Sequence, residues 1–366
     1  MIWLTWRQFR AQAITAATAL AVFAIVLATT GSHLSSMYNS SGLITCHGDT
    51  CAGLASQFLI QLSSGALLGI PGNAYVILYF LSVVVILIAP AITGCFWGAP
   101  LIARELEAGT FRLTWNQSVT RTRWLTVKLA LTGVAAMAVT EALSLLQAWW
   151  AAPIGKAVGL GGSASIFSEG RFGWFVFPTH GITPLGYAAF GFALGVTAGL
   201  LIRRPIPAMA ITLAIFAAVQ FATPLLIRPN LLPTSRTVAT IAAAEANVTA
   251  RLGPRMTVTA AAVPGQPGAW IMSSGIVSAA GQPVSTVPAA CQSAIPIPNV
   301  QGRTALSQSQ SSALANCLAS HGMRVAESYQ PASHYWPLQW SETGIFLALA
   351  LALAWYCFWR LNRRRS

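Results

Sequence analysis

Basic residues gather beside the long apolar runs of this chain in a regular alternation. Two arginines precede the first run, and further basic clusters follow the second, fourth and sixth runs. These positions are Arg7 and Arg10, the segment 104–128, Arg203 with Arg204, and the arginines of 360–365. Because basic loops stay on the cytoplasmic side of a membrane during insertion, the pattern predicts six membrane spans with both termini in the cytoplasm.

The composition also indicates that lipid surrounds much of this chain. Hydrophobic residues make up 55% of the 366 residues and charged residues only 8%, whereas soluble domains carry about 25% charged residues. The net charge of +13 could indicate nucleic-acid binding in a soluble protein, but most basic residues here lie in the orienting loops. The preference for Ala, and for Arg over Lys, is typical of a GC-rich bacterial genome. We therefore expect a multi-pass protein of a bacterial cell membrane, without a nucleic-acid partner.

Six apolar runs are long enough to cross a bilayer, which requires about 17–25 residues. Pro90 predicts a kink in the second run, and the short turn 203–205 predicts a tight helical hairpin between the fourth and fifth runs. Residues 1–11 combine Trp with Arg and are expected at the membrane interface, although a signal peptide is an alternative for the first run. The predicted spans are 13–29, 75–97, 127–149, 182–202, 206–227 and 344–359.

A second compartment is predicted between spans five and six. Over 228–339 the hydropathy falls, and Ser, Thr, Pro and Gln become frequent. Patterns there favour strands near 255–263, 268–279 and 323–329, and a helix over 304–321 that Gly322 would end. The predicted fold class is therefore an α-helical polytopic membrane protein with a small extracytoplasmic α+β domain before the last span.

The rest of the chain then forms the membrane part. It comprises 1–227, with an outer loop at 31–74 and a cytoplasmic loop at 99–126, and 340–366, which contains span six and a basic tail. Within the outer loop, 52–70 is nearly long enough to span, but Gln and Ser side chains interrupt it. We expect an extracytoplasmic or re-entrant helix there rather than a seventh span.

The cysteines predict two disulfides. Cys46 and Cys51 share the first outer loop, and Cys291 and Cys317 share the large outer domain, so both pairs would lie in an oxidising compartment. The second bridge would stabilise its loop by about 3 kcal/mol. A metal site at Cys46, His47 and Cys51 is the alternative, although the spacing matches no common zinc pattern. Cys95 and Cys357 lie within spans, where we expect them to be packing residues.

No catalytic motif is found in the sequence. A Walker A motif is absent, since Gly155-Lys156 lacks the preceding glycine, and so are HExxH, GxSxG and dinucleotide-binding fingerprints. The eight acidic residues are scattered along the chain. We therefore expect a non-enzymatic protein that binds no cofactor, and whose energy comes from a partner or an ion gradient.

The segment 101–130 concentrates charge in one predicted cytoplasmic loop. Gly109 can end a helix that emerges from span two, and Thr110 can cap the next turn. Thr120 can cap the helix that re-enters as span three. These features predict a short rigid elbow between two spans, although a plain solvated loop with orienting arginines is the alternative.

Several segments resemble the ABC-2-type transporter permeases. The stretch from Arg104 to Thr110, followed by 118–123 and Lys128, resembles the loop of that family, and the six-span layout and basic amphipathic start also match. The segments WLTWRQFRAQ and YQPASHYWPLQWSETGIF resemble actinobacterial members that have a large outer domain before the last span. The resemblance covers the membrane part and the end of the outer domain, but not its middle, about 230–320.

This resemblance implies the permease subunit of an ATP-driven exporter. Two permease chains, identical or different, would form the pathway, and separate ATPase subunits would hold ATP and Mg. The loop between spans two and three would transmit closure of the ATPases. The coupling residues implied are Arg104, Glu105, Glu107, Gly109, Thr110, Arg121 and Arg123. A proton-coupled secondary transporter and a membrane anchor for an outer sensing or binding domain are the alternatives.

Two further features lie within the spans. Glu141 is the acidic residue deepest in a span, where an ionisable group is a functional candidate. It could be paired with a polar residue of another helix, or it could serve a pathway or carry protons. Gly191, Gly195 and Gly199 form overlapping GxxxG units that permit close helix packing. We expect them to pack against span five, with a dimer seam as the alternative.

Overall fold

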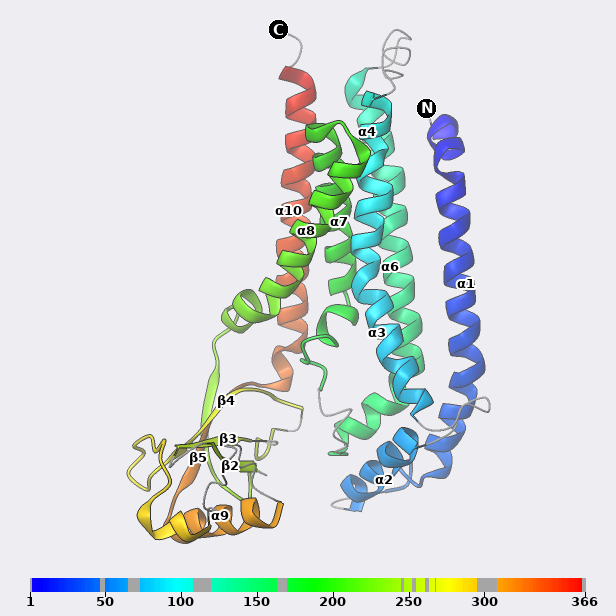
Figure 1. Cartoon of the computed structure of the whole chain (residues 1–366). Helices are drawn as coiled ribbons and strands as arrows, with labels where there is room; N and C mark the ends of the chain where they lie inside the picture. The colour runs from blue at the N-terminus through cyan, green and yellow to red at the C-terminus, as the bar shows by residue number, and fades with distance from the viewer. Residues whose placement is uncertain are drawn as a thin grey trace, which may run out of the picture. The chain divides into compact units, whose positions relative to one another are not determined.

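The computed structural model divides the chain into two compact units. One contains Met1–Leu231 and Trp336–Ser366, and the other contains Leu232–Tyr335; we call them the helical unit and the sheet unit (Figure 1). The sheet unit is slightly shorter than the predicted outer domain, because the residues just before and after it belong to the helical unit. The structure describes residues 2–46, 50–64, 73–107, 120–162, 170–244, 247–251, 255–260, 263–266, 268–294 and 308–363.

The helical unit consists mainly of α-helices, most of them long and apolar. Its α-helices are α1 (Ile2–Ser40), α2 (Thr50–Ser64), α3 (Ala74–Thr93), α4 (Ala99–Glu107), α6 (Arg121–Gly159), α7 (Thr183–Ile202), α8 (Pro205–Ala222) and α10 (Tyr335–Arg363). Its π-helical turns are η1 (Gly94–Gly98) and η3 (Thr223–Ile227), and its 3-10 turns are η2 (Phe177–Thr179) and η4 (Arg228–Asn230).

Among the described residues, six helical stretches are long and apolar enough to cross a membrane. They are Phe9–Ser40, Ala74–Glu107, Thr122–Gly159, Thr183–Ile202, Pro205–Asn230 and Ala332–Arg363. Each contains one of the predicted spans, apart from a residue at the start of the fourth. Most extend beyond them, because helices continue through polar residues that hydropathy alone excludes. Helix α2 is a separate element and is not among these six.

The central helix of the unit is α7. It packs against α3, η1, α4, α6 and α8. In its apolar 18-residue stretch 78% of the residues are buried, whereas in that of α1 only 11% are. In Figure 1, α7 lies among the other long helices of the helical unit. The predicted hairpin to α8 is present: Arg203 adopts a left-handed conformation with φ 61°, and Pro205 begins the next helix.

The structure places two further sequence features of the helical unit. Residues 2–11 belong to α1, which runs without a break from Ile2 to Ser40. Pro90 lies inside α3, and the π-helical turn Gly94–Gly98 begins four residues after it. The α-helix continues through Pro90, while the two glycines of the turn lie directly against the backbone of α7.

The sheet unit contains an antiparallel sheet and a separate hairpin. The three-stranded sheet has the order β1 (Ser235–Thr240), β5 (Arg324–Gln330), β4 (Trp270–Val277), and β2 (Asn247–Arg251) pairs with β3 (Arg255–Thr259). The core of this unit joins sheet residues such as Val325 and Ile276 to Leu314 and Leu318 of α9 (Gln308–Ser320). The remaining elements are the 3-10 turns η5 (Ala289–Ala294) and η6 (Ala332–His334).

Sequence patterns predict three of the five strands that the structure describes in this unit, and also its helix α9. Strands β3, β4 and β5 and helix α9 lie within or next to the predicted ranges, and Gly322 ends α9 with φ 72°. The amide of Met323 donates to the carbonyl of Leu318 over 3.1 Å, as in a Schellman motif. Strands β1 and β2 were not predicted. In β1, Val238 is exposed and the remaining side chains are small or polar, so the strand lacks a clear apolar alternation.

Candidate functional site

A buried ion pair joins the two helices that flank the charged loop. Lys128 of α6 contacts the carboxylate of Glu105 on α4, and the side chains of these two residues are 4% and 16% exposed. The ammonium also lies 4.9 Å from the ring centroid of Trp124. Because two charged groups are withdrawn from water together, the pair fixes α4 against α6 at the base of the loop.

Around this pair, the predicted coupling residues divide into exposed and structural groups. The side chains of Arg104, Glu107 and Arg123 are exposed, whereas Glu105 is held in the ion pair. Arg121 begins α6, and the hydroxyl of Thr120 accepts a hydrogen bond from the Arg123 amide over 3.3 Å. That geometry confirms the predicted cap. Gly109 and Thr110 lie outside the described residues.

The π-helical turn η1 also attaches α4 to neighbouring helices. It connects α3 directly to α4, and the side-chain amide of Gln12 donates to the carbonyl of Phe96 over 3.0 Å. Phe9 of α1 contacts Trp97 with 4.9 Å between ring centroids. The second span therefore reaches the loop as one connected helical stretch that is held against α1, α6 and α7.

The glycines of α7 allow the backbone of the second span to lie very close to this helix. A β-carbon at Gly191 would lie 2.7 Å from the carbonyl oxygen of Pro90, and one at Gly195 would lie 2.9 Å from the amide nitrogen of Ala99. At Gly199 the nearest atom is the carbonyl oxygen of Ala99. The prediction that these glycines pack against span five is wrong for Gly195 and Gly199, whose nearest neighbours belong to span two. Span five contributes the Phe216 ring at Gly191.

A second polar cluster joins α7, η4 and α10. Glu342 accepts hydrogen bonds from Arg228 over 2.9 and 3.1 Å and from the Tyr187 hydroxyl over 2.8 Å. The side chains of Arg228 and Glu342 are fully buried. Gln339, one turn before Glu342, accepts from the amides of Ile182 and Thr183 over 3.1 Å each. Gln339 and Glu342 are both fully buried and make contacts between helices.

Among the described residues, Glu141 has no partner of the kind that the sequence suggested. Its Oε2 atom is buried and accepts no hydrogen bond in the described part of the chain. Two turns further along α6, both amide atoms of Gln147 are buried without a partner among the described residues, whereas Ser144 donates to the carbonyl of Thr179 over 2.8 Å. Pairing as a structural role for Glu141 is thus not found in the described residues.

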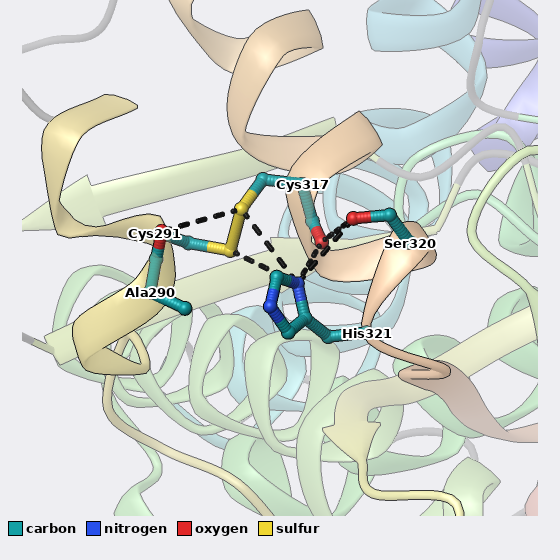
Figure 2. Close-up of a disulfide and its surroundings, with 5 residues drawn as sticks. All are labelled: Ala290, Cys291, Cys317, Ser320 and His321. Atoms are coloured by element: carbon teal, nitrogen blue, oxygen red, sulfur yellow. Dashed lines mark hydrogen bonds between the residues drawn. A yellow bond between two sulfur atoms is a disulfide. The ribbon is translucent and has the colours of Figure 1, made fainter.

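Both predicted disulfides are present. Cys46 is joined to Cys51, and Cys291 is joined to Cys317. Figure 2 shows the second bridge beside His321, whose Nδ1 lies 3.9 Å from each sulfur. Cys291, Cys317 and His321 are close enough together to be a metal-ligand group, but the sulfurs are bonded to each other, and thiolates are required for metal binding. The free cysteines Cys95 and Cys357 are buried, as expected of packing residues.

The six apolar helical stretches define a multi-pass helical membrane protein. A family model described as "ABC-2 membrane transporter related" matches residues 17–228, which is more than half of the chain. The chain belongs to this family and is a component of a membrane transporter. Membership implies partnership with an ABC ATPase, and the permeases of the family are typically non-catalytic membrane subunits. No curated protein and no solved structure matches the chain.

Several residues of these clusters were not predicted from the sequence. In the sequence, Lys128 is part of the loop motif and Arg228 is the first residue of the less hydrophobic region 228–339. The sequence does contain one indication, since both are basic residues at the edge of an apolar run. Burying such a charge is costly unless an acidic residue elsewhere in the chain pairs with it. The sequence does not reveal which acidic residue that partner is.

Proposed function

We propose that this chain is the permease subunit of an ATP-driven ABC exporter. In this proposal both termini and the loop 99–126 are cytoplasmic, and the sheet unit is extracytoplasmic. Two permease chains form the pathway, and a separate ATPase supplies the energy. Apolar cargo such as a lipid or a hydrophobic natural product suits the family.

The observation that carries this proposal is the ion pair of Lys128 with Glu105. It lies where α4 and α6 approach the loop, so a force on the loop would be transmitted to both helices rather than absorbed by bending. The exposed charges of Arg104, Glu107 and Arg123 remain available for a partner surface. Such an arrangement is suited to transmitting ATPase closure to the second and third spans.

Further support comes from the contacts of the same helices within the unit. Helix α4 continues from η1, which packs through glycine contacts against the central helix α7. A displacement of α4 would therefore reach α7 through backbone contacts, which are stiffer than contacts between long side chains. The loop, α4 and α7 form a continuous mechanical route from the proposed ATPase contact to the middle of the unit.

The direct test is purification and reconstitution of the tagged full chain with the ATPase that co-purifies with it. We expect transported compounds to stimulate ATP hydrolysis in the wild type, and Glu107→Arg to uncouple hydrolysis from transport without preventing membrane insertion. Arg324→Glu, a charge reversal at an exposed position of the sheet unit, is the control and should behave like the wild type. Failure of any ATPase to associate, or wild-type coupling in Glu107→Arg, would contradict the assignment.

Topology needs its own measurement. Cysteines introduced at Thr122 and Ser285, which are both exposed, can be labelled with a membrane-impermeant maleimide in intact cells and in inverted vesicles. We expect Thr122→Cys to react only from the cytoplasmic side and Ser285→Cys only from the other side. The reverse pattern would overturn the proposed orientation.

Glu141 supports one alternative function, that of a proton-coupled secondary transporter. A buried carboxylate oxygen without a partner among the described residues could carry a proton through a secondary transporter. Glu141→Gln would then abolish transport driven by a pH gradient. Unchanged transport in this variant, with continued dependence on ATP, would eliminate the alternative.

A further inference from the structure

We propose that Arg228, Glu342 and Tyr187 form a latch that fixes the first turns of α7 to both chain segments leading to the sheet unit. While the latch is closed, these segments and the start of α7 are held together, and opening it frees them at the same time. The inference concerns contacts inside the helical unit and does not depend on the proposed ATPase partner.

The latch lies beside both connections to the sheet unit in the sequence. Arg228 stands four residues before that unit begins at Leu232, and Glu342 stands seven residues after it ends at Tyr335. The ion pair therefore spans 114 positions of sequence and closes the whole intervening unit into one loop. Inside the helical unit, this ion pair therefore joins the segment before the sheet unit to the segment after it.

Contacts with α7 connect this pair to the central helix. The Tyr187 hydroxyl donates to Glu342, and the rings of Tyr187 and Phe346 lie 4.3 Å apart between centroids. The Arg228 guanidinium lies 4.1 Å from the ring centroid of Phe177, just before α7. Glu342 thus accepts from the last residues before the sheet unit and from α7 with the same carboxylate.

Gln339 adds a second attachment on the same helix. It accepts from the amides of Ile182 and Thr183 at the start of α7, and it donates to the carbonyl of Phe177 over 3.3 Å. Gly181 has φ 68°, and a β-carbon there would lie 2.7 Å from the Gln339 carbonyl oxygen. The absence of a side chain at Gly181 allows α10 to cap the first turn of α7.

The two connections differ in their backbone. On one side, α10 runs from Tyr335 to Arg363 without interruption, so a displacement at its start is transmitted along the helix. On the other side, α8 is followed by a π-helical turn and a 3-10 turn that end at Asn230. Because these short turns are not a continuous α-helix and the poorer hydrogen-bond geometry of a 3-10 turn opposes bending less, the Arg228 side can bend unless the ion pair holds it.

The buried ion pair makes the latch open and close in an all-or-none manner instead of loosening gradually. Both charged side chains are fully buried, so removing either partner leaves an uncompensated charge in an apolar environment. The bidentate geometry also requires both oxygens of Glu342 to be aligned with the guanidinium. Small displacements are therefore resisted, and the pair is either closed or open.

Hydrogen exchange of the full chain in lipid nanodiscs tests the latch. In Glu342→Gln we expect amide exchange to rise at least about tenfold in two segments together, 182–187 and 228–231, while β4 and β5 keep wild-type protection. The amides of Ile182 and Thr183 report directly on the cap from Gln339. The matched control is Glu105→Gln, which weakens the buried ion pair with Lys128 and should leave both segments at wild-type rates.

A second variant separates the two halves of the latch. Tyr187→Phe removes the hydroxyl that donates to Glu342 but keeps the ion pair, so exchange should rise over 183–187 and stay at the wild-type rate over 228–231. Wild-type exchange in Glu342→Gln, or a rise in only one of the two segments, would overturn the proposal. So would an equal rise in the Glu105→Gln control. If Glu342→Gln does not fold, Tyr187→Phe decides, and wild-type exchange over 183–187 in that variant would also overturn the proposal.

Discussion

Lys128 of α6 is buried against Glu105 of α4, twenty-three residues earlier in the sequence. This pair joins the helices on either side of the charged loop. We expect Lys128→Met to lower stability by about 3 kcal/mol, because Glu105 would then be held in a largely dehydrated site without the ammonium. Lys156→Met is the matched control, since Lys156 is exposed on the same helix and should change stability by less than about 0.5 kcal/mol. Thermal unfolding in nanodiscs measures both, and equal effects would contradict the argument.

The glycine contacts between α7 and the second span predict that replacing glycine by alanine has opposite effects on stability at Gly195 and at Gly155. Gly195→Ala should destabilise the unit by about 1–3 kcal/mol through overpacking, because a methyl group would meet the backbone at Gly94 and Ala99. At Gly155 of α6, nothing lies within 4 Å of the added carbon. Gly155→Ala should therefore stabilise the helix by about 0.5–1 kcal/mol. If both variants shifted the melting temperature in the same direction, the contact of α7 with the second span would be looser than described.

Glu327 predicts a pH dependence in the sheet unit. Its side chain is 2% exposed on β5, and both carboxylate oxygens lack a partner among the described residues. Burial raises the pKa of the Glu327 carboxyl above its ordinary value of 4.5. The folded state then binds this proton more tightly than the unfolded state, so the stabilisation is complete below the unfolded pKa. It is lost as the pH rises through the folded value.

Glu327→Gln should remove this pH dependence. We expect the variant to be more stable than the wild type at pH 7 by about 1–3 kcal/mol, because no buried charge has to form. The two should converge near pH 4, where the wild-type carboxyl is protonated. Unfolding of the sheet unit, followed by hydrogen exchange in β4 and β5 between pH 4 and 8, checks the sign. A variant that is less stable than the wild type at pH 7 would show that the carboxylate has a cationic partner.

The two disulfides should differ in their contribution to stability. Cys291–Cys317 closes a loop with a separation of 26 residues and Cys46–Cys51 one of only five. The chain-entropy argument gives about 3 kcal/mol for the first and about 2 kcal/mol for the second. Replacing both cysteines of a pair by Ser should therefore lower the free energy of unfolding more for Cys291–Cys317. Thermal unfolding without reductant measures the difference, and the reverse order would exclude loop entropy as the main cause.

Local features of the fold could be predicted because neighbouring residues determine them. Apolar runs of sufficient length predict spans, since every backbone polar group in lipid must be bonded within the helix. Thr120 caps α6 and Gly322 ends α9 through contacts only a few residues away. The pairing of nearby cysteines follows in the same way from short loops. Even so, the helix ends were misjudged where α1 and α10 continue beyond their apolar centres.

Long-range pairing was decided by the tertiary structure alone. The sequence contains Arg228, Glu342, Lys128 and Glu105, but the charge pattern does not predict that the paired residues are 114 positions apart in one case and 23 in the other. The partner of the α7 glycines was likewise decided by the π-helical turn at Gly94–Gly98, whose position depends on packing against α7. In lipid, apolar surface does not select one helical neighbour over another. Close backbone contacts and buried polar pairs make that selection, and they exist only once the helices are assembled.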